Sequence, residues 1–196
     1  MPPRKVHDAA LRGVLLEQTS RLVAEQGSAA VNVRAAATAS GTSTSAVYAL
    51  FGSREKLLAA VADEAVARFA AHLATAPITD DPAADLQTLG RAYRRSALDD
   101  PHFYRVMFDP GPARLPAVGG DETTFGVLQR VVQRCIDAGL TRTGHNDATR
   151  MASTLWALVH GQLQLELAGL GAPTEAARAA AFDAAMQDIW LGLARR

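Results

Sequence analysis

The stretch VRAAATASGTSTSAVYALFGSREK, from Val33 to Lys56, decides how the rest of the chain is interpreted. It contains a short alanine-rich run that ends at Gly41 and a second short run that ends at Phe51, directly before Gly52. Two short helices joined by a turn that contains glycine are typical of a helix-turn-helix, whose second helix lies in the major groove of DNA. DNA binding is therefore the leading hypothesis for this sequence.

Length and charge limit what such a motif can belong to. The chain has 196 residues, of which 48% are hydrophobic, so it can build a core in one domain or in two small ones. The formal net charge is zero, but the first 60 residues hold seven basic and four acidic side chains, which leaves the remainder acidic. A basic head on an acidic body suits a chain that contacts phosphate with one end only.

Cysteine usage and hydropathy indicate where the protein works. Cys135 is the single cysteine, which excludes an intrachain disulfide and any cysteine-based zinc finger and favours a reducing compartment. The N-terminus lacks the apolar core of a signal peptide, and no apolar run approaches the ~18 residues that a membrane span needs. We expect a soluble, cytoplasmic protein with no membrane partner.

Apolar residues recur at helical spacing along most of the chain, and no stretch alternates with period two, so the predicted fold is all-α. Two prolines predict a loose arm over residues 2–6, and prolines and glycines predict a loop over residues 109–120. The expected helices, about nine, cover residues 7–26, 33–40, 44–50, 53–74, 83–98, 102–108, 122–138, 147–170 and 174–194.

Two segments resemble a known family. LLEQTSRLVAEQG followed by VNVRAAATASGTSTSAVYALFGSREKLLAAV is similar, without a gap, to the DNA-binding head of the TetR family of bacterial repressors. Further on, LWALVHGQLQLELAG resembles the Trp-His-Gly segment of one subgroup of TetR ligand-binding domains, here Trp156, His160 and Gly161. The resemblance implies a three-helix helix-turn-helix domain over residues 1–52 and a helical ligand-binding and dimerisation domain over 53–196, with a helix at 53–75 linking the two.

The resemblance also implies a function. A protein of this kind is a transcriptional repressor that binds a palindromic operator in double-stranded DNA as a homodimer. A small, largely apolar effector relieves that binding. It needs no cofactor, no metal ion and no catalytic residue.

The second helix of the motif carries hydroxyls but no arginine, lysine, asparagine or glutamine. Ala49 and Leu50 stand where larger polar or aromatic residues are common in the family. Thr44 and Ser45 can meet base edges or phosphates, and the threonine methyl can contact a thymine methyl. We therefore expect affinity to come from phosphates and part of the specificity from DNA shape or from the Arg4-Lys5 arm.

Matching family positions place several side chains at the DNA backbone, although Tyr48 could instead belong to the core and Arg34 could be a solvated charge. The predicted DNA-binding residues are Arg34, Thr42, Ser43, Thr44, Ser45, Tyr48, Arg54 and Lys56.

Aromatic side chains of the body gather in three segments and predict a ligand pocket. Such clusters are often plain core, and His160 could be a hydrogen-bonded core histidine. The predicted ligand-binding residues are Tyr93, Phe103, Tyr104, Met107, Phe125, Leu128, Trp156 and His160.

The helix at 147–170 has two apolar stripes and therefore needs two burial partners, one of which we expect to be a second subunit. Burial within a monomer is the alternative. The predicted interface residues lie on this helix and the last one: Leu155, Leu158, Leu165, Phe182, Met186, Ile189 and Leu193.

Two other functions compete with this one. An enzyme is disfavoured because the sequence has no nucleophile motif, no glycine-rich phosphate loop and no metal-ligand spacing. A ligand-binding dimer whose head no longer binds DNA specifically is the other alternative.

Overall fold

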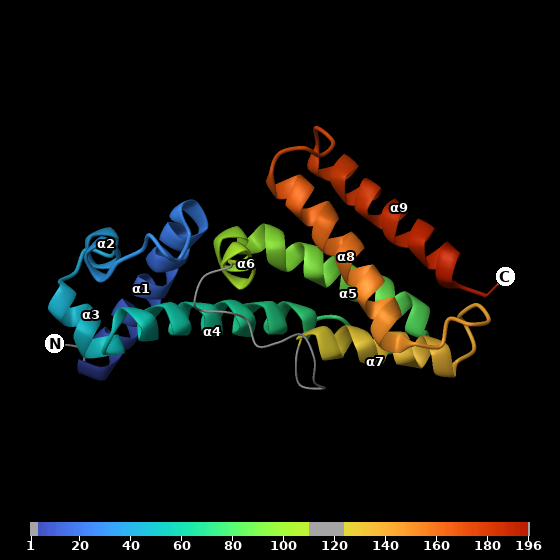
Figure 1. Ribbon diagram of the computed structural model, residues 1–196, viewed down its shortest axis with the longest axis horizontal. Helices are drawn as coiled ribbons and strands as arrows, with labels where there is room; N and C mark the ends of the chain where they lie inside the picture. The colour runs from blue at the N-terminus through green and yellow to red at the C-terminus, as the bar shows by residue number, and fades with distance from the viewer. Residues whose placement is uncertain (1–3, 110–123, 196) are drawn as a thin grey trace. The chain divides into compact units, whose positions relative to one another are not determined.

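The computed structural model describes residues 4–109 and 124–195. Within these ranges the chain is all-α, as predicted, with one isolated β-bridge between Thr141 and Ala194. Figure 1 labels the helices, which are α1 (Arg4–Gln26), α2 (Val33–Ala39), α3 (Thr44–Phe51), α4 (Arg54–Leu73), α5 (Pro82–Asp99), α6 (Pro101–Met107), α7 (Thr124–Asp137), α8 (Ala148–Leu167) and α9 (Glu175–Leu193). No helix in the described ranges is both long and apolar enough to cross a membrane.

The helices group into two compact units. The first comprises described residues 4–68 and 100–109, and the second comprises 69–99 and 124–195. This division differs from the boundary at residue 52 expected from the sequence, because residues 54–68 of α4 and all of α6 belong to the first unit. Helix α4 is continuous and contributes residues to both units.

Capping side chains set the limits of α2 and α3 in the first unit. The Asn32 carboxamide oxygen accepts a hydrogen bond from the Ala35 N–H at 2.9 Å, and the Ser43 hydroxyl accepts one from Ala46 at 3.1 Å. Between the two helices Gly41 has a φ of 63°, a left-handed conformation that other residues rarely adopt. The turn between the helices is therefore encoded locally.

Apolar side chains from α1, α3 and α4 form the core of the first unit, where Leu15, Val47 and Leu57 have exposed fractions of 1% or less. Helix α6 packs against α1. Just beyond α6, the Asp109 carboxylate accepts a hydrogen bond from the Ser28 N–H at 2.7 Å, which fastens the loop after α1. The core thus holds α3 by its inner face and leaves its outer face to solvent.

In the second unit α5 packs against α7, α8 and α9. Its approach to α9 is close, since a Cβ atom at Gly90 would lie 3.0 Å from the terminal methyl of Met186. Leu86, Met151 and Leu163 are among the buried residues that fill this unit.

The structure changes two details of the predicted helices. Helix α1 begins at Arg4, so the predicted loose arm is wrong for residues 4–6, because the two prolines lie before the first helical residue rather than within the helix. The predicted loop at 109–120 falls, apart from Asp109, outside the described residues.

Candidate functional site

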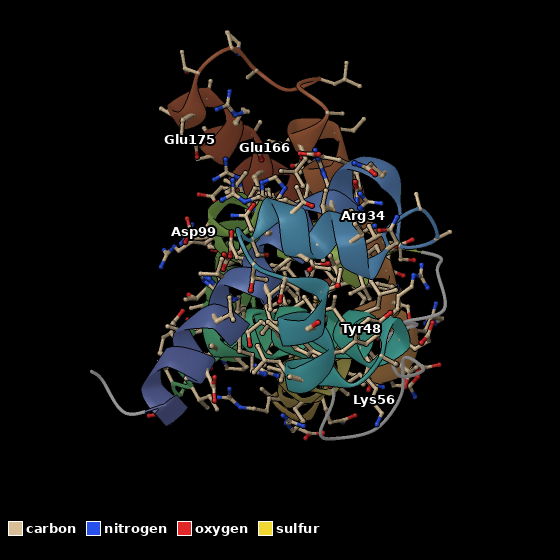
Figure 2. All side chains as sticks on the ribbon, turned by 90° about the vertical axis from the view of Figure 1, so that its left-hand side faces the viewer. Arg34, Tyr48, Lys56, Asp99, Glu166 and Glu175 are labelled. Atoms are coloured by element: carbon tan, nitrogen blue, oxygen red, sulfur yellow. The ribbon has the colours of Figure 1, made fainter. Side chains whose placement is uncertain are left out.

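The outer face of α3 is made of exposed side chains. Val47 and Phe51 point into the core, whereas Ser45, Tyr48 and Ala49 are exposed, Tyr48 with 52% of its surface accessible. Figure 2 shows Tyr48 together with Arg34 of α2 and Lys56 of α4 on one side of the first unit. Three consecutive helices thus present a hydroxyl-bearing ring and two cations to solvent.

The predicted DNA-binding hydroxyls have different roles. Ser43 is exposed, but its hydroxyl oxygen accepts the capping hydrogen bond of α3. Thr42 is half-buried and its N–H donates to the Ala37 carbonyl in the turn. Thr44 and Ser45 are exposed, and their hydroxyls have no partner in the part of the chain that the structure describes. Of the serine and threonine hydroxyls in the predicted set, those of Thr44 and Ser45 are both accessible and uncommitted.

Arg54, which the sequence placed at the DNA backbone, is tied into the protein. Its Nε donates to the carbonyl of Val31 at 2.6 Å, and its Nη2 donates to those of Ser28 at 2.6 Å and Ala29 at 3.2 Å. The first turn of α4 is thereby joined to the loop between α1 and α2. This role escaped sequence reasoning because the partners lie 23 to 26 positions away and are backbone atoms that leave no residue pattern.

Arg34 and Lys56, by contrast, are exposed cations without a partner among the described residues. They are the side chains of the predicted set that remain available to neutralise phosphate. The Arg34 guanidinium stands on the first turn of α2, and the Lys56 ammonium on the first turn of α4.

The predicted ligand residues divide between the two units. Phe103, Tyr104 and Met107 of α6 are buried in the first unit, and the Arg68 guanidinium lies 4.1 Å from the centre of the Phe103 ring. These three side chains help to pack α6 within that unit. The other five residues, Tyr93, Phe125, Leu128, Trp156 and His160, belong to the second unit.

Trp156 is the centre of the aromatic group in the second unit. Its indole N–H donates to the Tyr93 hydroxyl at 3.1 Å, and its ring lies 6.1 Å from that of Phe125 and 5.9 Å from that of His160. Burial lowers the pKa of His160, so the imidazole is neutral near pH 7. Leu128 is half-buried on α7. The group is thus uncharged and mostly apolar. Its polar groups are the Tyr93 hydroxyl, the Trp156 indole N–H and the His160 imidazole.

A separate pocket of about 290 Å³ lies between α5 and α9, and its lining includes none of the predicted ligand residues. Arg94 borders it and donates to Glu166 at 2.6 Å and to Glu175 at 2.8 Å, which Figure 2 shows near each other. Hydrogen bonding from Arg94 lowers the pKa of Glu175. Sequence reasoning missed this ion-pair network because its members lie 72 and 81 positions from Arg94.

The predicted interface residues are only partly available to a second chain. Leu155, Phe182, Met186 and Leu193 are buried within the single chain, so they contribute to its own core. Leu158 and Ile189 are half-buried, while 55% of Leu165 is exposed.

Exposed apolar surface also occurs on α9, where Leu191 is 60% accessible and Ala181 and Ala184 are exposed. Leu191 lies off the helical spacing of the predicted interface residues Phe182, Met186, Ile189 and Leu193, so the sequence pattern does not mark it.

Two family models match the chain. Residues 15–61 match the one described as bacterial regulatory proteins, tetR family, and residues 86–189, more than half of the chain, match the one described as tetracyclin repressor-like, C-terminal domain. The chain belongs to the TetR family. It is therefore a DNA-binding transcription regulator with a ligand-binding C-terminal domain.

Solved structures of TetR regulators share this fold. A TetR family transcription regulator from Marinobacter aquaeolei VT8 is 20% identical over 98% of this chain and 100% of its own, with a TM-score of 0.74. The TetR family regulator PfmR from Thermus thermophilus is 22% identical over 93% and 96%, with a TM-score of 0.72. A protein of unknown function from Rhodococcus sp. RHA1 is 28% identical over 94% and 96%, with a TM-score of 0.69. A comparison with curated proteins found no match.

The contacts of Arg54 predict that it stabilises the TetR head rather than only contacting DNA. Arg54→Met should lower the free energy of unfolding by about 1–3 kcal/mol, because partly buried carbonyls lose their donors. The measurement is urea denaturation of the full chain. Lys56→Met removes the same charge from an exposed, unpartnered site and should change stability by less than about 0.5 kcal/mol. Equal effects of the two substitutions would contradict the role assigned to Arg54.

Proposed function

We propose that this TetR family protein is a repressor, that it binds a palindromic operator as a homodimer, and that a small, largely apolar effector releases it. The observation that carries the proposal is the outer face of α3, which is exposed beside the unpartnered cations Arg34 and Lys56. Because the operator is genomic DNA, the protein acts in the bacterial cytoplasm.

Phosphate contacts should supply most of the affinity. Arg34 and Lys56 can each neutralise a phosphate, and the exposed Tyr48 hydroxyl can donate a neutral hydrogen bond to another. Cations release condensed counterions when they bind DNA, whereas a phenol does not. The two kinds of contact therefore differ in how salt affects them.

A mobility-shift assay with DNA from around the gene's own promoter tests this arrangement. Arg34→Ala should weaken binding to all sequences about equally and make the salt slope shallower by roughly one unit. Tyr48→Phe should weaken binding without changing the slope. Arg95→Ala, which removes an exposed and unpartnered arginine of the second unit, is the charge-matched control and should leave binding unchanged. A changed sequence preference in Arg34→Ala would instead make Arg34 a base reader.

The dimer proposal rests on exposed apolar surface of the second unit. On α8, Leu158 and Leu165 lie seven positions apart and so on one side of the helix, and on α9 Ala181, Ala184 and Leu191 are exposed. Alanines permit close approach of two helices. A two-fold dimer carries two related heads, so its operator must have two related half-sites.

Charge placed on this surface should separate the subunits. Leu165→Arg should shift the protein from dimer to monomer at micromolar concentration and weaken operator binding. Leu170→Arg is the matched control, because Leu170 is 72% exposed but lies beyond the end of α8. Analytical ultracentrifugation of both variants measures the effect. A wild-type protein that is monomeric at micromolar concentration would refute the dimer.

The aromatic group around Trp156 is the proposed effector site. Tyr93, which accepts the Trp156 hydrogen bond, also packs edge-to-face on Phe69 of α4 at 4.8 Å. The preceding residue on α4, Arg68, pairs with Glu17 of α1 at 3.5 Å and with Asp100 at 3.0 Å. Neighbouring positions of one helix therefore join the proposed effector site to contacts of the DNA-binding unit.

This continuity gives the effector a physical means of acting on DNA binding. A ligand changes operator affinity only by binding the DNA-competent and incompetent conformations unequally, and the coupling is reciprocal, typically ~1–3 kcal/mol. A ligand that displaces Trp156 from Tyr93 would change the packing of Phe69, and hence of α4.

Truncation of Trp156 tests the effector site. Small aromatic or aliphatic molecules are first screened for release of fluorescent operator DNA from the wild-type protein. We expect an active molecule to release Trp156→Ala only at a concentration roughly tenfold higher than wild type requires, a shift within the range of allosteric coupling. The operator affinity of Trp156→Ala without the molecule should change less than this dose response, although the substitution also removes the hydrogen bond to Tyr93. Trp190→Ala on α9 is the matched control. An unchanged dose response in Trp156→Ala would move the effector site elsewhere.

Two alternatives make different predictions in the same assays. A ligand-binding dimer without specific DNA binding would respond to small molecules but would not prefer promoter DNA over random DNA. An enzyme would convert a bound molecule. We propose that the protein has no catalytic activity, which its membership of a regulator family supports.

A further inference from the structure

The exposed side of α3 has an unusual chemical composition for a surface that meets base edges. Thr44 and Tyr48 lie one turn apart, as do Ser45 and Ala49, and all four are exposed. Apart from the tyrosine ring, this surface offers only methyl groups and hydroxyls. We propose that the protein reads its operator chiefly through thymine methyl groups, with Thr44 and Ala49 as the specificity-determining residues. The inference rests on the proposed DNA binding and names the class of sequence that is bound.

Hydrogen-bond readout of purines requires side chains that this surface lacks. Guanine is recognised by arginine or lysine, and adenine by asparagine or glutamine, through paired donors and acceptors. Helix α3 contains none of these four residue types. A hydroxyl can donate or accept, so Thr44 and Ser45 discriminate weakly between bases.

Two of the nearby side chains that could read purines, Asn32 and Arg54, are committed elsewhere. The Asn32 carboxamide oxygen caps α2, which holds this side chain at the start of α2 rather than on the helix that enters the groove. The Arg54 guanidinium is held by the carbonyls of Ser28, Ala29 and Val31. Arg34 has no partner among the described residues, but it stands on α2 rather than on the helix that enters the groove.

The methyl groups on the exposed side of α3 match one feature of the major groove. The 5-methyl group of thymine is the apolar group that base pairs display there, and alanine and threonine methyls are suited to contact it. Ser45 and Ala49 lie farthest from the buried pair Val47 and Phe51, and Thr44 begins the helix. The surface therefore favours thymines at fixed places in each half-site.

Chemical removal of the thymine methyl tests this inference directly. The full-length protein first selects duplexes from a random 30-bp library, and the tightest binders are then synthesised with thymine or with deoxyuridine, which differs only by that methyl. Each lost contact should weaken binding about fourfold, the equivalent of one buried methyl group. Two half-sites with one contact each should together lose about 16-fold.

Two protein variants connect the effect to named residues. Thr44→Ser and Ala49→Gly remove the side-chain methyls, so each should reduce the ratio between thymine and deoxyuridine affinities, as a double-mutant cycle measures. Glycine costs about 1 kcal/mol of helix propensity, so the circular dichroism of Ala49→Gly is compared with that of wild type, whereas Thr44→Ser avoids this problem. Arg34→Ala is the control and should weaken both duplexes equally.

Restoring the methyl on another base provides a second readout. At a thymine position that proves sensitive, 5-methylcytosine paired with guanine should bind more tightly than unmethylated cytosine, because it returns the methyl to the same place in the groove.

The outcomes distinguish a failure of the proposed DNA binding from a failure of methyl readout alone. If the selection yields no preferred duplex, the proposed DNA-binding function fails. If preferred duplexes bind equally with thymine and deoxyuridine, or if the deoxyuridine penalty is unchanged in both variants, DNA binding stands and methyl readout is wrong. A changed preference in Arg34→Ala would then identify a base-reading guanidinium instead.

Discussion

Two arginines fix α4 within the first unit, and the exposed surface of that unit depends on them. Arg54 ties the first turn of α4 to three carbonyls of the loop after α1. Arg68, fourteen positions later, pairs with Glu17, Glu64 and Asp100 and covers the Phe103 ring, which joins α1, α4 and α6. Because α3 ends just before α4 begins, a fixed α4 also limits where α3 can lie. The orientation of α3 is therefore set partly by guanidinium groups that bind carbonyls and carboxylates of the protein itself.

This use of charge leaves few cations for the nucleic acid. Arg54 and Arg68 bind carbonyls and carboxylates of the protein, so among the described side chains of the predicted set Arg34 and Lys56 are the unpartnered cations for phosphate, with Tyr48 as a neutral donor. Two phosphate contacts from these two cations would give weak binding to non-specific DNA. Weak background binding makes even modest base discrimination useful, because competing genomic sites are numerous.

The sequence predicted those features of the fold that depend on residues close to one another in the chain, such as helix ends and turns. Asn32 and Ser43 cap α2 and α3, and Gly41 ends the turn between them, so these helices were found nearly to the residue. The start of α1 was wrong because the two prolines precede the helix instead of excluding it. Contacts between residues distant in the sequence could not be predicted from it. The hydrogen bonds of Arg54 and the ion pairs of Arg94 join residues far apart in the sequence, which no local sequence pattern connects. Helical spacing indicated that Leu155 and Phe182 are buried, but it did not show that the residues that bury them belong to the same chain. The aromatic residues of α6 are buried in the first unit, and the prediction that they contact a ligand stays a prediction.

The small side chains on the outer face of α3 also bear on how such a regulator diverges. Ser45 and Ala49 are exposed, and the Ser45 hydroxyl has no hydrogen-bond partner among the described residues. A substitution at either position therefore carries little cost in folding, while it alters the groups presented to a base pair. Two related genomes could hold copies of this protein that fold equally well and control different sets of genes after one or two codon changes. The stability of the head and the identity of its target sites are thus inherited through separate residues, which leaves the target sites free to change first.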